Sequence, residues 1–116
     1  MALYEFHFTI NWFGHNFVGM DLGFNCNVTV EHIILGGDNS AQEINYNIGG
    51  QNSNTVTLTF PERTIGAEGV TIFVQSESQV LPQINNVTLY QPNRGGKIPY
   101  SNSQLQQLNE KLWPQN

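Results

Sequence analysis

The stretch Tyr4-Glu-Phe-His-Phe-Thr-Ile10 decides the fold class of this 116-residue chain. Apolar residues, most of them aromatic, occupy every second position, and polar residues fill the positions between them. Successive side chains of a β-strand point to opposite faces of a sheet, so this period of two predicts a half-buried strand with an aromatic inner face. The same alternation recurs in residues 28–34, 44–48, 56–60, 70–74 and 84–89, and more weakly in residues 17–24.

Segments rich in glycine, asparagine and serine separate the predicted strands, and these are residues that turns favour. They include residues 36–40 and 49–54. No helical pattern lies between the strands, which excludes a parallel α/β sheet. We therefore predict an all-β fold, an antiparallel β-sandwich of the jelly-roll type with a short C-terminal helix. Residues 1–92 would form the β-sandwich domain, and residues 93–116 a polar loop followed by the helix.

The C-terminal segment has a different period. Leu105, Leu108, Leu112 and Trp113 fall on one face of a helix, and Ser101–Ser103 offers an N-cap before its first turn. A helix of about three turns is marginal on its own in water. We therefore expect it to pack either on the sandwich or on a partner subunit, which would make the protein a homo-oligomer.

The composition limits the classes of partner. Charged residues make up 11% of the chain, the net charge is −5, and asparagine and glutamine contribute about a fifth of the residues. Four lysines and arginines are too few for a nucleic-acid-binding surface, and no apolar run is long enough to span a membrane. Side-chain amides donate and accept hydrogen bonds without carrying charge, which suits neutral polyhydroxylated ligands. The same abundance also fits a biased genome.

The cellular location is left open by the sequence. The first residues, Met-Ala-Leu-Tyr-Glu-Phe, lack the basic segment and continuous apolar run that begin a secretory signal. The single cysteine, Cys26, cannot form a disulfide within the chain, so the sequence shows no sign of an oxidising compartment either.

Residues that could carry catalysis are sparse. His7 and His32 lie inside predicted strands, where core or cross-strand roles are the simpler interpretation, and Cys26 is interpreted as a small buried residue. No zinc-binding spacing and no nucleophile-elbow motif occurs, and the nine acidic residues are scattered. We therefore predict a protein that is not an enzyme and that requires no cofactor.

The segment after the first predicted strand is the leading binding candidate. Trp12, Phe13, His15 and Asn16 stand together at the end of that strand. Aromatic faces stack on sugar rings, and neighbouring amides and imidazoles bond hydroxyl groups. The alternative is that Trp12 and Phe13 plug the end of the sandwich as part of the core.

A metal site is considered only at the glycine-rich turn. Asp38 and Asn39, with Glu43 nearby, offer oxygen ligands of the kind that calcium takes. Two carboxylates are few for such a site, and a hairpin turn with local hydrogen bonds explains the same residues. We predict no required metal.

One short segment resembles a known class of protein. Ile84-Asn-Asn-Val-Thr-Leu-Tyr90 is similar to the closing strand of jelly-roll carbohydrate-binding modules. The resemblance covers about seven residues and implies no ligand residues. A polar linker and a helix after this strand are not part of the usual pattern of such modules.

These features lead to one functional expectation and one alternative. We expect a non-catalytic, lectin-like module that recognises neutral glycans through the aromatic and asparagine-rich loop. The alternative is a structural assembly protein, such as a viral or phage capsid or tail component, or a small toxin subunit. The oligomeric state in solution and a glycan array discriminate between the two.

Overall fold

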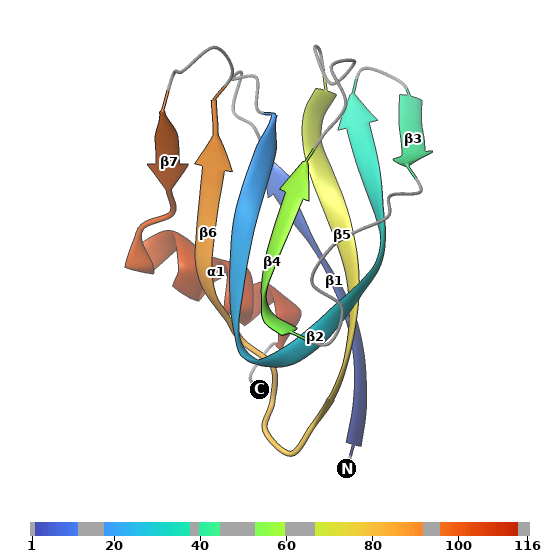
Figure 1. Ribbon diagram of the computed structural model, residues 1–116, viewed down its shortest axis with the longest axis vertical. Coiled ribbons are helices and arrows are strands. Elements are labelled where there is room, and N and C mark those ends of the chain that lie inside the picture. The colour runs from blue at the N-terminus through green and yellow to red at the C-terminus, as the bar shows by residue number, and fades with distance from the viewer. Residues whose placement is uncertain are drawn as a thin grey trace.

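The computed structural model of the chain describes residues 2–11, 18–37, 40–44, 53–59, 67–91 and 96–113. These residues form one antiparallel β-structure and one helix (Figure 1). The strands, in chain order, are β1 (Ala2–Asn11), β2 (Gly19–Gly37), β3 (Ser40–Ile44), β4 (Ser53–Thr59), β5 (Ala67–Ser78), β6 (Ile84–Tyr90) and β7 (Lys97–Pro99), and the helix is α1 (Asn102–Leu112).

The long strand β2 organises the sheet. Its first part, Gly19–Gly23, pairs with β4 on one side and with β6 on the other. Its later part pairs with β5 and β3, after register shifts that begin between Gly23 and Val28. Bulges of this kind bend a strand and increase its twist. One strand therefore runs through both halves of the structure.

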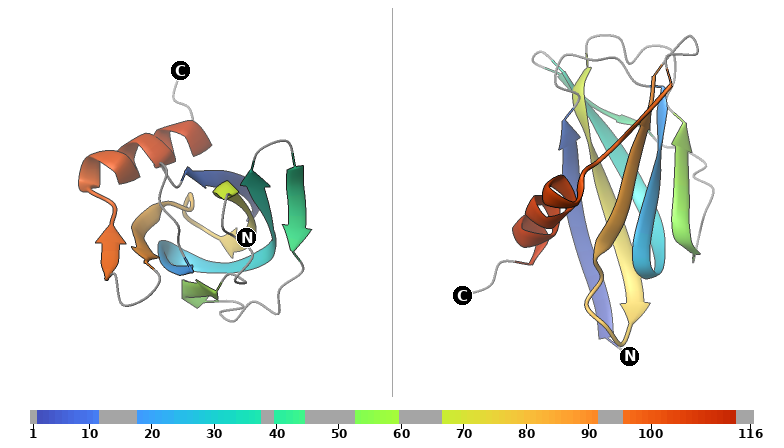
Figure 2. Two further views of the ribbon diagram at one scale, coloured as in Figure 1. Left: turned by 90° about the horizontal axis from the view of Figure 1, so that it is seen from above. Right: turned by 90° about the vertical axis from the view of Figure 1, so that its left-hand side faces the viewer.

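The sheet curls around its own apolar face. The strand order is β1-β5-β2-β6-β7, with β3 and β4 attached to β2 off this path. The predicted antiparallel β-fold with a short C-terminal helix is confirmed. The predicted sandwich would have two separate sheets. In the structure β2 pairs with strands of both halves, and the sheet forms a curled half-barrel (Figure 2).

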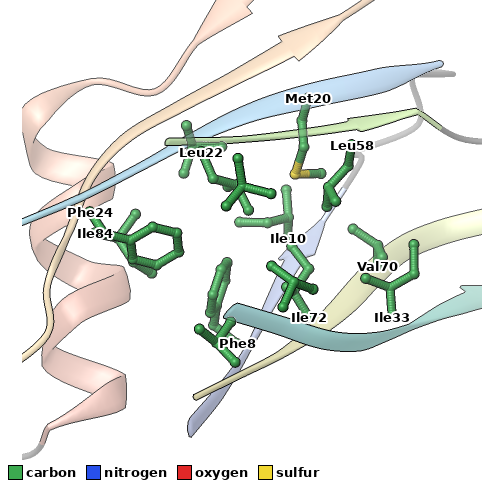
Figure 3. Packing of buried hydrophobic residues seen from close by; sticks show 14 of the residues in the cluster. Phe8, Ile10, Met20, Leu22, Phe24, Ile33, Leu58, Val70, Ile72 and Ile84 are labelled. Carbon is green, nitrogen blue, oxygen red and sulfur yellow. The ribbon is translucent and has the colours of Figure 1, made fainter. Parts of the chain in front are cut away.

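The core lies inside this curl (Figure 3). The apolar positions of the first quoted stretch point inward as predicted: Phe6, Phe8 and Ile10 are buried, and Glu5 and Thr9 are exposed. Phe24 meets Phe6 and Phe8 edge-on, with ring centroids 6.3 Å apart in both pairs. Other buried members from all parts of the sheet are Met20, Leu22, Val28, Val30, Ile33, Val56, Leu58, Val70, Ile72, Val74, Ile84, Val87 and Leu89.

Helix α1 covers the side of the curl where the two ends of the sheet face each other (Figure 2, left). Leu108 is buried in the core, and Leu105, Leu112 and Trp113 pack partly against it. The apolar face of α1 is therefore used by its own chain. Ser101 begins the helix with a reciprocal capping box, in which its side chain accepts from the Gln104 backbone and its backbone donates to the Gln104 side chain.

Two segments differ from the sequence-based expectation. Residues 19–24 of the expected strand 17–24 belong to the same strand, β2, as residues 28–34, which were expected to form a separate strand. Gly23 lies inside this strand and does not end it: a Cβ atom at this position would lie 2.5 Å from the Asn85 side-chain oxygen and 3.0 Å from the Asn86 Cβ atom. The polar linker also contains a short strand, since β7 pairs with Thr88–Tyr90 of β6. No helix among the described residues is long and apolar enough to cross a membrane.

Candidate binding site

The predicted ligand loop, Trp12, Phe13, His15 and Asn16, lies outside the described residues, as do Asp38 and Asn39 of the considered metal turn. Glu43 belongs to β3, where its backbone stands opposite Ile34 of β2. Within the described part of the chain, no three histidine, cysteine or acidic side chains gather closely enough to hold a metal ion.

The two strand histidines form a cross-strand stack. His32 lies against the ring of Phe73 with centroids 4.2 Å apart and planes at 15°, and His7 lies 5.2 Å from the other side of Phe73. The three residues come from neighbouring strands in register on the outer face of the sheet. Cross-strand contacts of this kind stabilise a sheet, which matches the structural role expected for these histidines.

Cys26 is half-buried at the edge of the core and forms no disulfide. Its Sγ atom lies 3.5 Å from the Ser76 hydroxyl oxygen, and that hydroxyl donates to the Asn27 carbonyl oxygen. This setting fits the packing role expected from the sequence.

An open depression of about 970 Å³ lies between α1 and the connection from β5 to β6, and it is a candidate site among the described residues. We call it the α1 shelf. This volume is within the range of small-molecule sites. The helix residues that line it are spaced so that they share one side of α1. The lining residues are Leu81, Gln83, Asn102, Gln106, Asn109, Glu110 and Trp113.

Trp113 fixes the inner end of the α1 shelf. Its indole N–H donates to the Pro82 carbonyl oxygen at 2.6 Å. Its ring lies 5.5 Å from Phe6 and 5.9 Å from Tyr4, measured between centroids. The indole is therefore held on several sides and remains half-buried, so one part of its apolar surface lines the shelf in a fixed position.

Asn109 ties α1 to the start of β6. Its Oδ1 accepts from the Ile84 N–H, and its Nδ2 donates to the Ile84 and Leu105 carbonyl oxygens, at 2.8 to 3.0 Å. All of its side-chain polar atoms are thus occupied. Asn109 supports the shelf and is not itself available to a ligand.

Other amides of the shelf are available. Among the described residues, no hydrogen bond occupies the side-chain amides of Gln83 and Asn102, and both residues are exposed. Gln106 donates to Glu110 at 3.2 Å, which leaves the Gln106 carbonyl oxygen as an acceptor. The shelf therefore combines amide donors and acceptors, one carboxylate and two apolar side chains, Leu81 and Trp113, and it contains no cation.

The apolar spacing of the C-terminal helix predicts how the helix packs and gives no indication of this site. The signal was present on the neighbouring polar face, where Asn102, Gln106 and Glu110 recur at intervals of four residues. Gln83 could not have been assigned, because it joins the site only through the fold.

Comparison of the chain with family models, curated proteins and solved structures found no match.

A separate polar cluster lies on the outer face of the other half of the sheet. Asp21 accepts one hydrogen bond from the Thr57 hydroxyl, at 2.8 Å, and another from the Tyr90 hydroxyl. The Lys97 ammonium lies 5.2 Å from the centre of the Tyr90 ring. The hydrogen bond to Asp21 raises the pKa of Tyr90 above the ordinary value of 10.0, with smaller effects from burial and from the Asp21 charge. The cluster joins three strands, β4, β2 and β6.

We expect Asp21→Asn to lower the pKa of Tyr90 towards 10.0, because ionisation would no longer break a hydrogen bond to a carboxylate. A raised pKa in the folded state means that Tyr90 stabilises the protein fully below about pH 10 and loses this contribution as the pH rises through its folded pKa. Phenolate absorbance against pH measures the shift. Tyr100, whose pKa is raised by burial alone, serves as the internal control. A titration unchanged by Asp21→Asn would contradict the assignment.

Proposed function

We propose that this protein is a non-catalytic carbohydrate-binding module for neutral glycans, with the α1 shelf as a binding surface. The observation that carries the proposal is the convergence of the free amides of Gln83 and Asn102 with the apolar surfaces of Trp113 and Leu81. None of the described residues that line this shelf is cationic.

The proposal rests on how sugars are recognised. A neutral sugar ring has apolar C–H surfaces and several hydroxyl groups that both donate and accept hydrogen bonds. An indole offers a flat apolar surface, and amides match hydroxyl groups without the cost of removing water from a charge. Trp113 is held by Pro82 and Phe6, so little side-chain entropy is lost when a ligand binds to it.

The Trp12 loop remains part of the proposal as a second contact surface. Trp12, Phe13, His15 and Asn16 offer the same combination of rings and amides, and they follow Asn11 at the end of β1. Testing both surfaces on the same ligand shows which of them binds it. The finer assignment to a jelly-roll sandwich belongs to this proposal too, supported by the similarity of Ile84–Tyr90 to the closing strand of such modules.

A glycan array tests the proposed class directly. We expect the labelled wild-type protein to bind one set of related neutral glycans above background, and to leave them chemically unchanged. Binding that is confined to sulfated or carboxylated glycans, or an array with no signal, would contradict the proposal. Analysis of the bound glycan by mass spectrometry after incubation tests the absence of catalysis.

One observation favours the second candidate, a structural assembly subunit. Leu3, Val80 and Leu81 are 57%, 53% and 40% exposed, and they lie at the start of β1 and in the connection from β5 to β6. Exposed apolar groups of this size near one end of the molecule are a surface for self-association. Defined higher oligomers at micromolar concentration would support an assembly subunit, and loss of those oligomers in a Leu3→Ser, Val80→Ser variant would locate the interface.

A further inference from the structure

The outer edge of β1 has no strand beside it among the described residues, because β1 is the first strand of the sheet and pairs only with β5. A strand in this position presents its backbone N–H and C=O groups to any strand that approaches. No backbone hydrogen bond from β1 to α1 or β7 is present in the described part of the chain. Within the described part of the chain, the edge of β1 is therefore a row of unused donors and acceptors.

A depression of about 400 Å³ opens onto this edge. Its lining includes the consecutive residues His7, Phe8 and Thr9, although the side chains of His7 and Thr9 point outward and that of Phe8 points into the core. Consecutive side chains of a strand point to opposite faces of the sheet, so a cavity on one face touches only every second residue. A cavity that touches consecutive residues lies at the edge of the strand. The backbone of these residues therefore borders the depression, which we call the β1 groove.

The opposite wall of the β1 groove comes from α1. Of the α1 residues that line it, Leu108 is buried in the core and Leu112 is half-buried, whereas Gln107 and Lys111 are exposed. Among the described residues, no carboxylate lines the groove, in a chain whose net charge is −5. Among the described residues, no acidic side chain pairs with the exposed Lys111, whereas the ammonium of Lys97 lies over the Tyr90 ring.

We propose that the β1 groove binds the extended C-terminal end of a partner protein, with an apolar last residue. The partner's backbone would add to β1 as an edge strand beside residues 7–9. Its terminal carboxylate would lie at Lys111, and its last side chain would rest on the exposed part of Leu112. This inference is independent of glycan binding, because the groove and the α1 shelf share none of their lining residues.

Three features select this ligand over a sugar. A row of alternating backbone donors and acceptors matches another extended backbone, and strand addition uses this match for affinity. An unpaired lysine matches a single carboxylate, and each peptide chain carries one at its end. The half-buried Leu112 lines the groove together with Lys111, so an apolar terminal side chain and its carboxylate both find a partner on α1.

The test uses short fluorescein-labelled peptides ending in valine, leucine or phenylalanine, each made with a free C-terminal carboxylate and as the matched carboxamide. Fluorescence anisotropy with the full-length protein measures their affinities. We expect the best free-acid peptide to bind about tenfold or more tightly than its amide, the factor typical of a hydrogen bond to a charged group. Lys111→Gln should remove this difference, and Lys97→Gln should preserve it. Hydrogen exchange should show added protection in β1.

Several results would overturn the proposal. One is that the free-acid and carboxamide peptides bind with equal affinity. Another is that the Lys111→Gln variant still prefers the free-acid peptide. A third is that no peptide binds. Binding without new protection in β1 would place the peptide elsewhere on the surface and overturn it as well. If only a peptide that copies the protein's own last residues binds, the groove is a site of self-association and the assigned partner is wrong.

Discussion

Truncation of the chain after Tyr100 is expected to abolish cooperative folding or to lower the melting temperature by about 20 °C or more. The deletion removes α1 with its buried Leu108 and the partly buried Leu105, Leu112 and Trp113. A fully buried side chain of this kind contributes about 1.5–3 kcal/mol, so the combined loss is roughly 5 kcal/mol, comparable with the whole stability of a small domain. At about 4 °C per kcal/mol, this corresponds to the stated shift.

A chain that ends at Trp113 is the matched control, because it keeps every described contact of α1. Circular dichroism during heating compares the two truncated chains with the wild type. If the chain ending at Tyr100 melted like the wild type, α1 would contribute nothing to the closure of the curled sheet, and the description of the core would be wrong.

Asn109→Ala is expected to destabilise the fold by roughly 2–4 kcal/mol, although a partly polar, surface helix position usually tolerates alanine. The side chain of Asn109 satisfies both the N–H and the C=O of Ile84, a residue only 2% exposed. Leaving a buried donor or acceptor without a partner costs about 1–3 kcal/mol. Alanine favours the helix slightly, which offsets only a small part of this cost.

Asn102→Ala is the control, since it removes an exposed amide from the same helix and breaks no hydrogen bond among the described residues. Urea denaturation followed by fluorescence gives the free energy of unfolding of each variant. Equal stability of the Asn109 and Asn102 variants would show that the contact between α1 and β6 is not maintained in solution.

The sequence predicted most of the strands because one face of each is buried. In β1 and β4 the exposed and buried residues alternate as the hydrophobic pattern indicates, from Phe6 to Ile10 and from Val56 to Leu58. The capped, amphipathic helix was predictable for the same reason. The continuity of β2 was not, because a glycine interrupts an apolar pattern in the same way whether the strand ends there or a neighbour approaches closely, as Asn85 and Asn86 approach Gly23 inside β2.

Sites formed by separate parts of the chain were the least predictable. The α1 shelf needs Gln83, which precedes β6, and the β1 groove needs Lys111 beside a strand from the other end of the sequence. No periodicity links such residues. The sequence could indicate only a local cluster, such as Trp12 to Asn16, or a polar helix face, such as Asn102, Gln106 and Glu110.

The central claim is that the α1 shelf binds a neutral glycan, and isothermal titration calorimetry with the strongest neutral glycan of the array tests it most directly. We expect the double variant Gln83→Ala, Asn102→Ala to bind about tenfold more weakly than the wild type, because each lost hydrogen bond costs about 0.5–1.5 kcal/mol. Asn54→Ala, which removes an exposed amide of β4, should bind like the wild type. Trp12→Ala, measured in parallel, reports the contribution of the Trp12 loop. Unchanged affinity in the double variant, with or without a loss in Trp12→Ala, would contradict the claim.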